Sequence, residues 1–345
     1  MFTANYYRLI PALLLTFAAT AQAEPAPVRT ATVTLDTFVR AETDRYFGST
    51  VQRGGFGKFV HIRELMPVDR QTVIRANRDT LYSTAVFDLD AGPVTVTLPD
   101  AGKRFMSLTV INEDHEVPGI HYRAGSYTVD RKTVGTRYVM LGVRTLVDSD
   151  QLADTKQAWK LQDAIGASQP GGPGTFEVPS WDIPSRDAIR AALRVLGKSV
   201  PDSRGMFGTH AQVDPVRHLV GSAIAWGGNP EKDAFYQIVT PEQNDGIKSY
   251  RLSMGHVPVD AFWSVSVYNA EGYFVANTLQ AYSLNSLTAQ KGKGGVVDLR
   301  FGDCTAQTVN CLPIMPGWNY MVRYYLPKPA ILDGSWKLPQ ALPAS

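Results

Sequence analysis

The chain has 345 residues, of which 44% are hydrophobic, so it can bury more than one core. Its 34 basic and 32 acidic residues give a formal net charge of +2. This balance gives no electrostatic argument for binding nucleic acid or an anionic membrane surface. We therefore expect no nucleic-acid partner.

The first 23 residues have the three-part layout of a secretory signal peptide. Arg8 precedes an apolar stretch at residues 9–19, and residues 21–23 form an A-x-A cleavage site. The alternative is a retained membrane anchor, which needs about 20 apolar residues, whereas this stretch is shorter and contains Pro11. We expect cleavage before Glu24, a mature chain without a membrane span, and a periplasmic or secreted location.

Export affects how the two cysteines, Cys304 and Cys311, are interpreted. An oxidising compartment favours a disulfide between them. The alternatives are two buried free thiols, or a metal site, for which no histidine follows His256 in the chain. The sequence predicts a structural disulfide, no metal site and no cofactor.

The predicted elements of the first part indicate a β-sandwich behind a leading helix, residues 24–147. Residues 31–47 have mixed apolar spacing typical of a helix, with Thr34 or Asp36 as its N-cap. Residues 94–98 alternate, and residues 104–111 and 137–143 are rich in β-branched and aromatic side chains, as strands are.

A helical segment with a connector is predicted for residues 148–228. One helix follows Ser149, a Pro/Gly-rich connector covers residues 167–180, and a second helix covers residues 185–197. A third helix, residues 215–226, begins with Asp214 as its cap.

Strand patterns return in residues 229–345, at 261–269, 294–301 and 319–326. The aromatic residues of this part either pack as a sandwich core or form an exposed stacking platform for sugars. Alternation places Trp263, Val265 and Val267 on one face of their strand, and we expect this face to be core.

Two polar clusters are candidate sites. The stretch VIRANRDTLYS at residues 73–83 either binds an anionic or polyhydroxy ligand or forms an internal polar bracket. We expect Asn77 and Asp79 to be structural, with Asp79 accepting backbone amides or pairing with Arg75 or Arg78. We expect Arg78 to face a cleft. Arg75, Tyr82 and Tyr122 complete the candidate ligand-binding set.

The second cluster, VINEDHEVPGIHY at residues 110–122, places Asp114 beside His115. An imidazole next to a carboxylate suits general acid–base catalysis, so both are candidate catalytic residues. The alternative is an exposed acidic loop.

Several long stretches resemble known bacterial families. VIRANRDTLYS, VTLPDAGKRFMSLTVINEDH and GTRYVMLGVRTLVD resemble the domain-of-unknown-function family numbered 1254. VDPVRHLVGSAIAWGGNPEKDA, VDAFWSVSVYNAEGYFVANTLQAYSLNS and LPIMPGWNYMVRYYLPKPAILDGSWKLP resemble the family numbered 1214, which usually follows it in one chain. The resemblance implies a mainly β fold: an N-terminal immunoglobulin-like sandwich, a small helical segment and a C-terminal jelly-roll-like sandwich. It implies no activity.

Three functions remain open from the sequence. The first is an exported protein that binds a small polar or glycan-like ligand between its two β domains. The second is a hydrolase or lyase that uses His115 and Asp114, with Arg78 as an anion holder. The third is an envelope scaffold without a ligand. A single polar cleft that contains both Arg78 and His115 would favour the first two functions, and their separation would favour the third.

Overall fold

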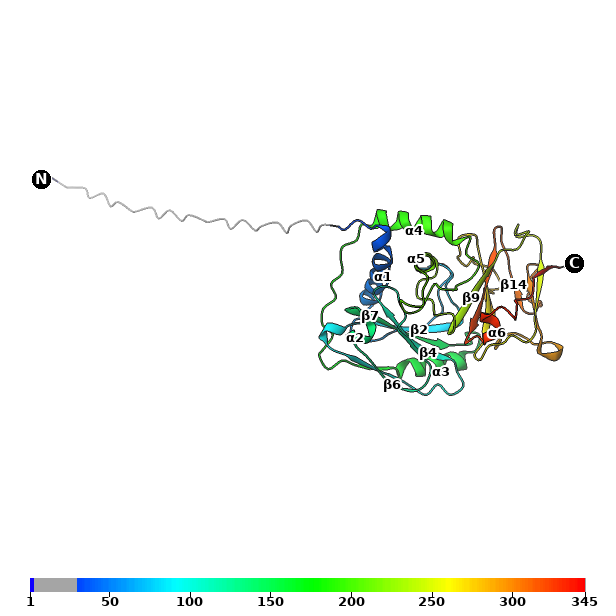
Figure 1. Ribbon diagram of the computed structural model, residues 1–345, viewed down its shortest axis with the longest axis horizontal. Helices are drawn as coiled ribbons and strands as arrows, with labels where there is room; N and C mark the ends of the chain where they lie inside the picture. Colours follow the sequence, from blue (N-terminus) through cyan, green and yellow to red (C-terminus); the bar gives the residue numbers. More distant parts are fainter. Residues whose placement is uncertain (3–29, 345) are drawn as a thin grey trace.

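The computed structural model describes residues 1–2 and 30–344. The apolar stretch and the cleavage site of the predicted signal peptide, residues 1–23, lie outside the described residues. The fold is mainly β, with two β-sandwiches and a helical segment, as predicted (Figure 1). Among the described residues, no helix combines the length and the apolar character that a membrane span needs.

The N-terminal sandwich consists of a five-stranded and a three-stranded antiparallel sheet. In sheet order, the first contains β1 (Val60–Ile62), β2 (Thr80–Asp88), β7 (Tyr138–Leu146), β4 (Met106–Asn112) and β5 (Gly119–His121). The second contains β6 (Gly125–Val129), β3 (Val94–Leu98) and β8 (Gly166–Ser168), and the connections include η1 (Leu89–Ala91) and α2 (Arg131–Val134). Apolar side chains such as Phe87, Val96 and Leu141 fill the space between the sheets.

Helices form a layer on the other face of the five-stranded sheet (Figure 1). This layer consists of α1 (Leu35–Gln52), α4 (Ile183–Gly197) and α5 (Pro215–Ile224), which share an apolar core. Asp182 and Asp214 cap α4 and α5 by accepting hydrogen bonds from backbone amides of the first turn. Phe47 of α1 packs on Val86 and Met140, so the sheet is buried on both faces.

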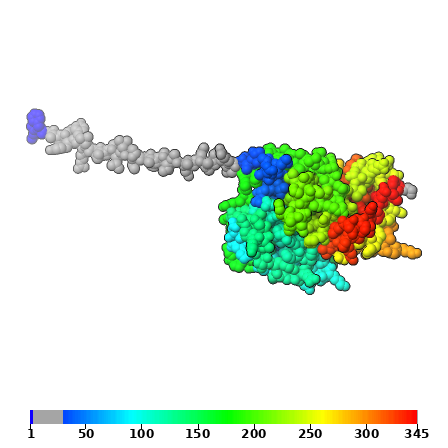
Figure 2. Space-filling model, in the orientation of Figure 1, coloured from blue at the N-terminus to red at the C-terminus, as the bar shows by residue number. Residues whose placement is uncertain are grey.

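The C-terminal sandwich consists of two four-stranded sheets. One contains β14 (Cys311–Leu312), β13 (Val297–Phe301), β10 (Tyr250–Met254) and β16 (Leu342–Pro343); the other contains β12 (Ser283–Asn285), β11 (Trp263–Tyr268), β15 (Asn319–Tyr325) and β9 (Ala234–Val239). The short elements η2 (Lys293–Gly295) and α6 (Pro329–Leu332) complete this part. Figure 2 shows the last residues, in red, lying across the surface of this sandwich.

Some element boundaries differ from the prediction. The first helix begins at residue 35 rather than 31, because Ala31 bridges to Trp181 and the chain before the helix is extended. The helix predicted after Ser149, α3 (Leu152–Asp163), has Gln151 as its N-cap. Strand β8 follows α3 and pairs with β3, so the N-terminal sandwich takes its last strand from beyond residue 147.

Strand β11 is buried on both faces. Trp263, Val265 and Val267 belong to the core of the C-terminal sandwich, as expected. The opposite face, with Ser264, Ser266 and Tyr268, is also buried, because the loop between β1 and β2 lies against it. This contact joins the two sandwiches and creates the region described next.

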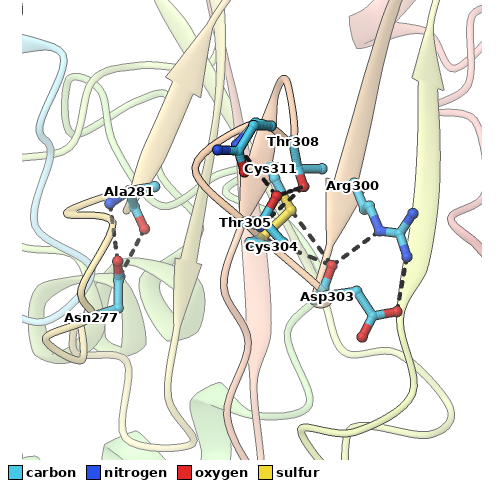
Figure 3. The surroundings of a disulfide bond; sticks show 10 residues. Asn277, Ala281, Arg300, Asp303, Cys304, Thr305, Thr308 and Cys311 are labelled. Carbon is cyan, nitrogen blue, oxygen red and sulfur yellow. Dashed lines mark hydrogen bonds and ion pairs between the residues drawn. A yellow bond between two sulfur atoms is a disulfide. The ribbon is translucent and has the colours of Figure 1, made fainter.

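The predicted disulfide is confirmed (Figure 3). The Sγ atoms of Cys304 and Cys311 are 2.03 Å apart. Cys311 begins β14, which pairs with β13, so the bond closes the loop that leads out of β13. In the chain-entropy model, a loop this short contributes about 2–3 kcal/mol of stability.

Candidate functional site

The polar stretch singled out in the sequence is the loop between β1 and β2, and it docks on the C-terminal sandwich. The backbone N–H of Arg75 donates to Gly272 O (2.8 Å), and the Tyr268 hydroxyl donates to Ala76 O (2.8 Å). The Gln71 amide donates to Phe274 O and accepts from Phe274 N–H, both at 2.8 Å. The loop is therefore a bracket between segments about 200 residues apart in sequence.

Asn77 and Asp79 make the internal contacts of this bracket. Asn77 Oδ1 accepts from the N–H of Asp79 (2.8 Å), and its Nδ2 donates to Thr80 Oγ1 (2.9 Å) and Tyr82 Oη (3.2 Å). The Asp79 side chain is buried, and its Oδ1 accepts from Asn285 Nδ2 (3.3 Å). Both placements agree with a structural role.

Two kinds of partner were expected for Asp79, backbone amides or one of the arginines Arg75 and Arg78. Neither is present among the described residues, because the Asp79 carboxyl forms no ion pair there and accepts from the Asn285 side chain. Burial raises the pKa of the Asp79 carboxyl, and the charge of Arg323 on β15 opposes this rise. Sequence reasoning missed Arg323, because it lies within NYMVRYY, a stretch that reads as a core strand.

The Arg78 side chain faces a groove of about 1220 Å³ between the two sandwiches. Its Nη1 donates to Met66 O, and its guanidinium lies 5.0 Å from the centre of the Tyr282 ring. Burial lowers the pKa of Arg78. No carboxylate forms an ion pair with Arg78 in the described part of the chain, so its charge is available to a molecule in the groove.

Arg75 leads to a different place. It has a left-handed backbone conformation (φ 51°) and lines a smaller inner pocket of about 110 Å³ together with Tyr82. The inner pocket and the groove share no lining residue. The bracket thus places Arg78 in the lining of the groove and Arg75 in the lining of the inner pocket. Arg75 also lines a neighbouring pocket of about 200 Å³, together with Arg194 and Glu271.

His115 and Asp114 do not form the predicted acid–base pair. His115 is fully buried, with Nδ1 2.7 Å from Ser222 Oγ, and its Nε2 accepts the N–H of Gly227 (2.8 Å). A ring that accepts at Nε2 is neutral with its proton on Nδ1, and burial lowers the pKa of His115 well below the ordinary value. Asp114 instead pairs with Arg40 on α1 (2.6 Å).

His115 therefore joins the N-terminal sandwich to α5, stacked between Trp226 and His218. It lines neither the groove nor the inner pocket, and so it is separated from Arg78. Tyr122 also lines neither the groove nor the inner pocket. Its hydroxyl donates to Asp233 Oδ1 (2.9 Å). Among the described residues, no group of three or more His, Cys, Asp or Glu side chains is arranged to hold a metal ion.

Comparisons with known proteins agree with this architecture. The family described as "Protein of unknown function (DUF1254)" matches residues 56–169, and "Protein of unknown function (DUF1214)" matches residues 237–329. Together the matches cover more than half of the chain. A comparison with curated proteins finds no match.

Two solved structures share the fold. The VPA0106 protein from Vibrio parahaemolyticus has a TM-score of 0.65 at 16% identity, over 90% of this chain and 98% of the other. A putative uncharacterized protein from Burkholderia cenocepacia has a TM-score of 0.50 at 10% identity, over 89% and 86%. At these identities the likeness shows the fold alone. In this chain a match to DUF1254 is followed by a match to DUF1214, so the resemblance to these two families, in this order, is confirmed.

Proposed function

We propose that this protein is exported and binds a polar, glycan-like ligand in the groove between its two β-sandwiches. The observation that carries this proposal is the position of Arg78 in the wall of a groove large enough for several sugar rings. Arg78 is half-buried and forms no ion pair with the residues that the structure describes. Groove-type sites between domains are common places for ligands.

The chemistry of the groove walls supports this class of ligand. One wall carries Trp159 of α3, and the other carries Tyr282, so two aromatic rings are available for the apolar faces of sugars. Hydroxyl, amide and carboxylate groups surround them, including Thr155, Asp150 and Asn310. Such groups suit a ligand with many hydroxyls, and Arg78 adds a forked donor for a carboxylate or a hydroxyl pair.

The acid–base mechanism considered from the sequence needs His115 and Asp114 to act together. In the structure His115 contacts Ser222 and Asp114 pairs with Arg40, so the two side chains do not form a catalytic pair. A scaffold without a ligand is the competing explanation, and the separation of Arg78 from His115 favours it by the criterion set from the sequence. The charge of Arg78 in the groove wall, unpaired within the described residues, is the observation that favours a ligand instead. The two differ in one respect: only a binding protein is stabilised by a specific ligand, by about 2.7 kcal/mol at a ligand concentration of 100 Kd.

The test is a thermal-shift screen of the protein with neutral and uronic-acid oligosaccharides, followed by calorimetric titration. We expect at least one oligosaccharide to raise Tm in the wild type and not in Arg78→Ala. The matched control is Arg251→Ala, because Arg251 is exposed on β10 and lines neither the groove nor the inner pocket. If no oligosaccharide binds, or if binding is unchanged in Arg78→Ala, the proposal is wrong.

A further inference from the structure

The inner pocket lies where three distant segments of the chain meet. Most of its walls come from the bracket at residues 73–77, from residues 225–228 after α5, and from β15 at residues 321–325. Tyr82, Arg144 and Tyr236 complete the lining. Each of the three segments belongs to a stretch that carries the family resemblance. The pocket is therefore built by the assembled chain and by no single domain.

Three arginines surround this pocket, and no carboxylate forms an ion pair with any of them among the described residues. Arg144 on β7 is 8% exposed and Arg323 on β15 is 3% exposed. Arg144 donates to Thr109 Oγ1 (2.7 Å) and Gly227 O (2.5 Å), which are neutral acceptors. The buried carboxyl group of Asp79 acts on the charge of Arg323, but no carboxylate is paired with Arg75 or Arg144 in the described part of the chain. Burying these two guanidinium groups without a counter-charge is costly, so this arrangement suits a negative ligand.

Arg75 supplies an unused donor. Its Nε is buried and has no hydrogen-bond partner within residues 30–344, and its side chain makes no hydrogen bond to the rest of that range. The backbone is held in the left-handed region by the bond from Arg75 N–H to Gly272 O. A Cβ at Gly272 would lie 2.6 Å from Ile74 Cγ2, so the close approach needs glycine. Backbone strain of this kind is typical of functional sites.

The remaining wall indicates what type of anion fits. Val73, Met321 and Trp226 give one side of the pocket an apolar surface. A volume of about 110 Å³ admits a molecule of only a few heavy atoms. We propose that the inner pocket binds a short-chain carboxylate, with its carboxylate group near Arg75, Arg144 and Arg323 and its carbon chain against the apolar side.

Donors and a cation surround the Tyr82 oxygen in the lining of this pocket. This oxygen accepts a hydrogen bond from Asn77 Nδ2, and the Arg144 guanidinium lies 5.6 Å from the ring centre of Tyr82. Burial by itself would raise the pKa of Tyr82, but the Arg144 charge and the surrounding hydrogen bonds lower it overall. Donors that favour a phenolate oxygen also favour a carboxylate oxygen.

The experiment is a calorimetric titration of the whole protein with propionate at constant ionic strength, with propionamide and inorganic phosphate as comparison ligands. Propionate is expected to bind, and uncharged propionamide is expected not to bind. Arg75→Gln should weaken propionate binding about 10- to 100-fold, because a charge-assisted hydrogen bond is lost. Since the Arg75 side chain makes no hydrogen bond within residues 30–344, this variant is expected to fold, and its Tm is measured beside that of the wild type.

The control is Arg78→Ala, which changes the groove and should leave propionate binding unchanged. Failure of the groove proposal and failure of the pocket proposal are thereby distinguished. If propionate does not bind, if it binds Arg75→Gln as well as wild type, or if only phosphate binds, the assignment to a short-chain carboxylate is wrong. If Arg75→Gln does not fold, the charge-preserving variant Arg75→Lys with the same ligands decides, and it must bind propionate more tightly than propionamide.

Discussion

The substitution Asp44→Asn tests how this protein tolerates a buried carboxyl group. Asp44 lies on α1 and is 3% exposed. One carboxylate oxygen, Oδ2, accepts from Trp181 Nε1 (2.8 Å), whereas Oδ1 is buried without a partner in the described part of the chain. Burial raises the pKa of Asp44 from 3.8 to about 6, and the hydrogen bond from Trp181 opposes this rise.

The sign of the stability effect follows from proton binding. Between pH 4 and pH 6 the folded protein keeps a proton on Asp44 that the unfolded chain has released, so stability falls as pH rises through this range. Because each pKa unit is worth about 1.4 kcal/mol, the rise from 3.8 to about 6 costs about 3 kcal/mol above pH 6. Asn at this position has no proton to lose and keeps an acceptor for Trp181, so this cost disappears.

The measurement is urea unfolding of wild type and Asp44→Asn at several pH values from 4 to 8. The difference in free energy of unfolding should move in favour of the variant by about 3 kcal/mol across this range. Any constant cost of placing an amide at residue 44 cancels in this comparison. Asp36→Asn, on the exposed side of the same helix, is the control for loss of one carboxyl group. A difference that stays constant with pH would refute the reasoning.

Three further outcomes are expected. Asp79→Asn should raise the free energy of unfolding at neutral pH, because it removes a buried carboxylate that has no ion pair within residues 30–344. A loss of more than about 1 kcal/mol in urea unfolding would contradict this. Trp263→Ala should cost about 3–5 kcal/mol, and a change within about 0.5 kcal/mol would show that the ring is not core. In an alkaline absorbance titration, one tyrosine should ionise below pH about 10 in the wild type and not in Tyr82→Phe; identical curves would exclude Tyr82 as that residue.

The architecture was predictable from the sequence because its signals are local. The N-cap at Asp214 and the alternation of apolar side chains at every second residue around Trp263 each involve fewer than ten neighbouring residues. Both are present in the structure. The first helix ends at Gln52 rather than at residue 47, because Phe47 and the turn after it pack on the sheet beneath. The end of a helix that is set by such tertiary contacts cannot be predicted from the neighbouring residues alone.

The candidate site was only half predictable. Arg78 was recognisable, because it lies in a polar run between apolar residues. Arg144 and Arg323 were not, because each is a single charge inside a strand whose neighbours are all core residues. Their role depends on contacts over long separations, such as the bond from Arg323 Nη2 to Arg75 O (2.8 Å), which spans 248 positions.

The polar residues 75–79 of the bracket lie beside both candidate binding spaces, but most of the residues that line these spaces come from other segments. Asn77 uses all of its hydrogen-bonding groups to hold the loop, and Asp79 is buried beneath it. These internal bonds fix the backbone so that two side chains three positions apart, Arg75 and Arg78, enter separate spaces. The rigidity of the loop therefore decides which arginine serves which space. A substitution at Asn77 should disturb both the groove and the inner pocket, whereas a substitution at either arginine should disturb only one.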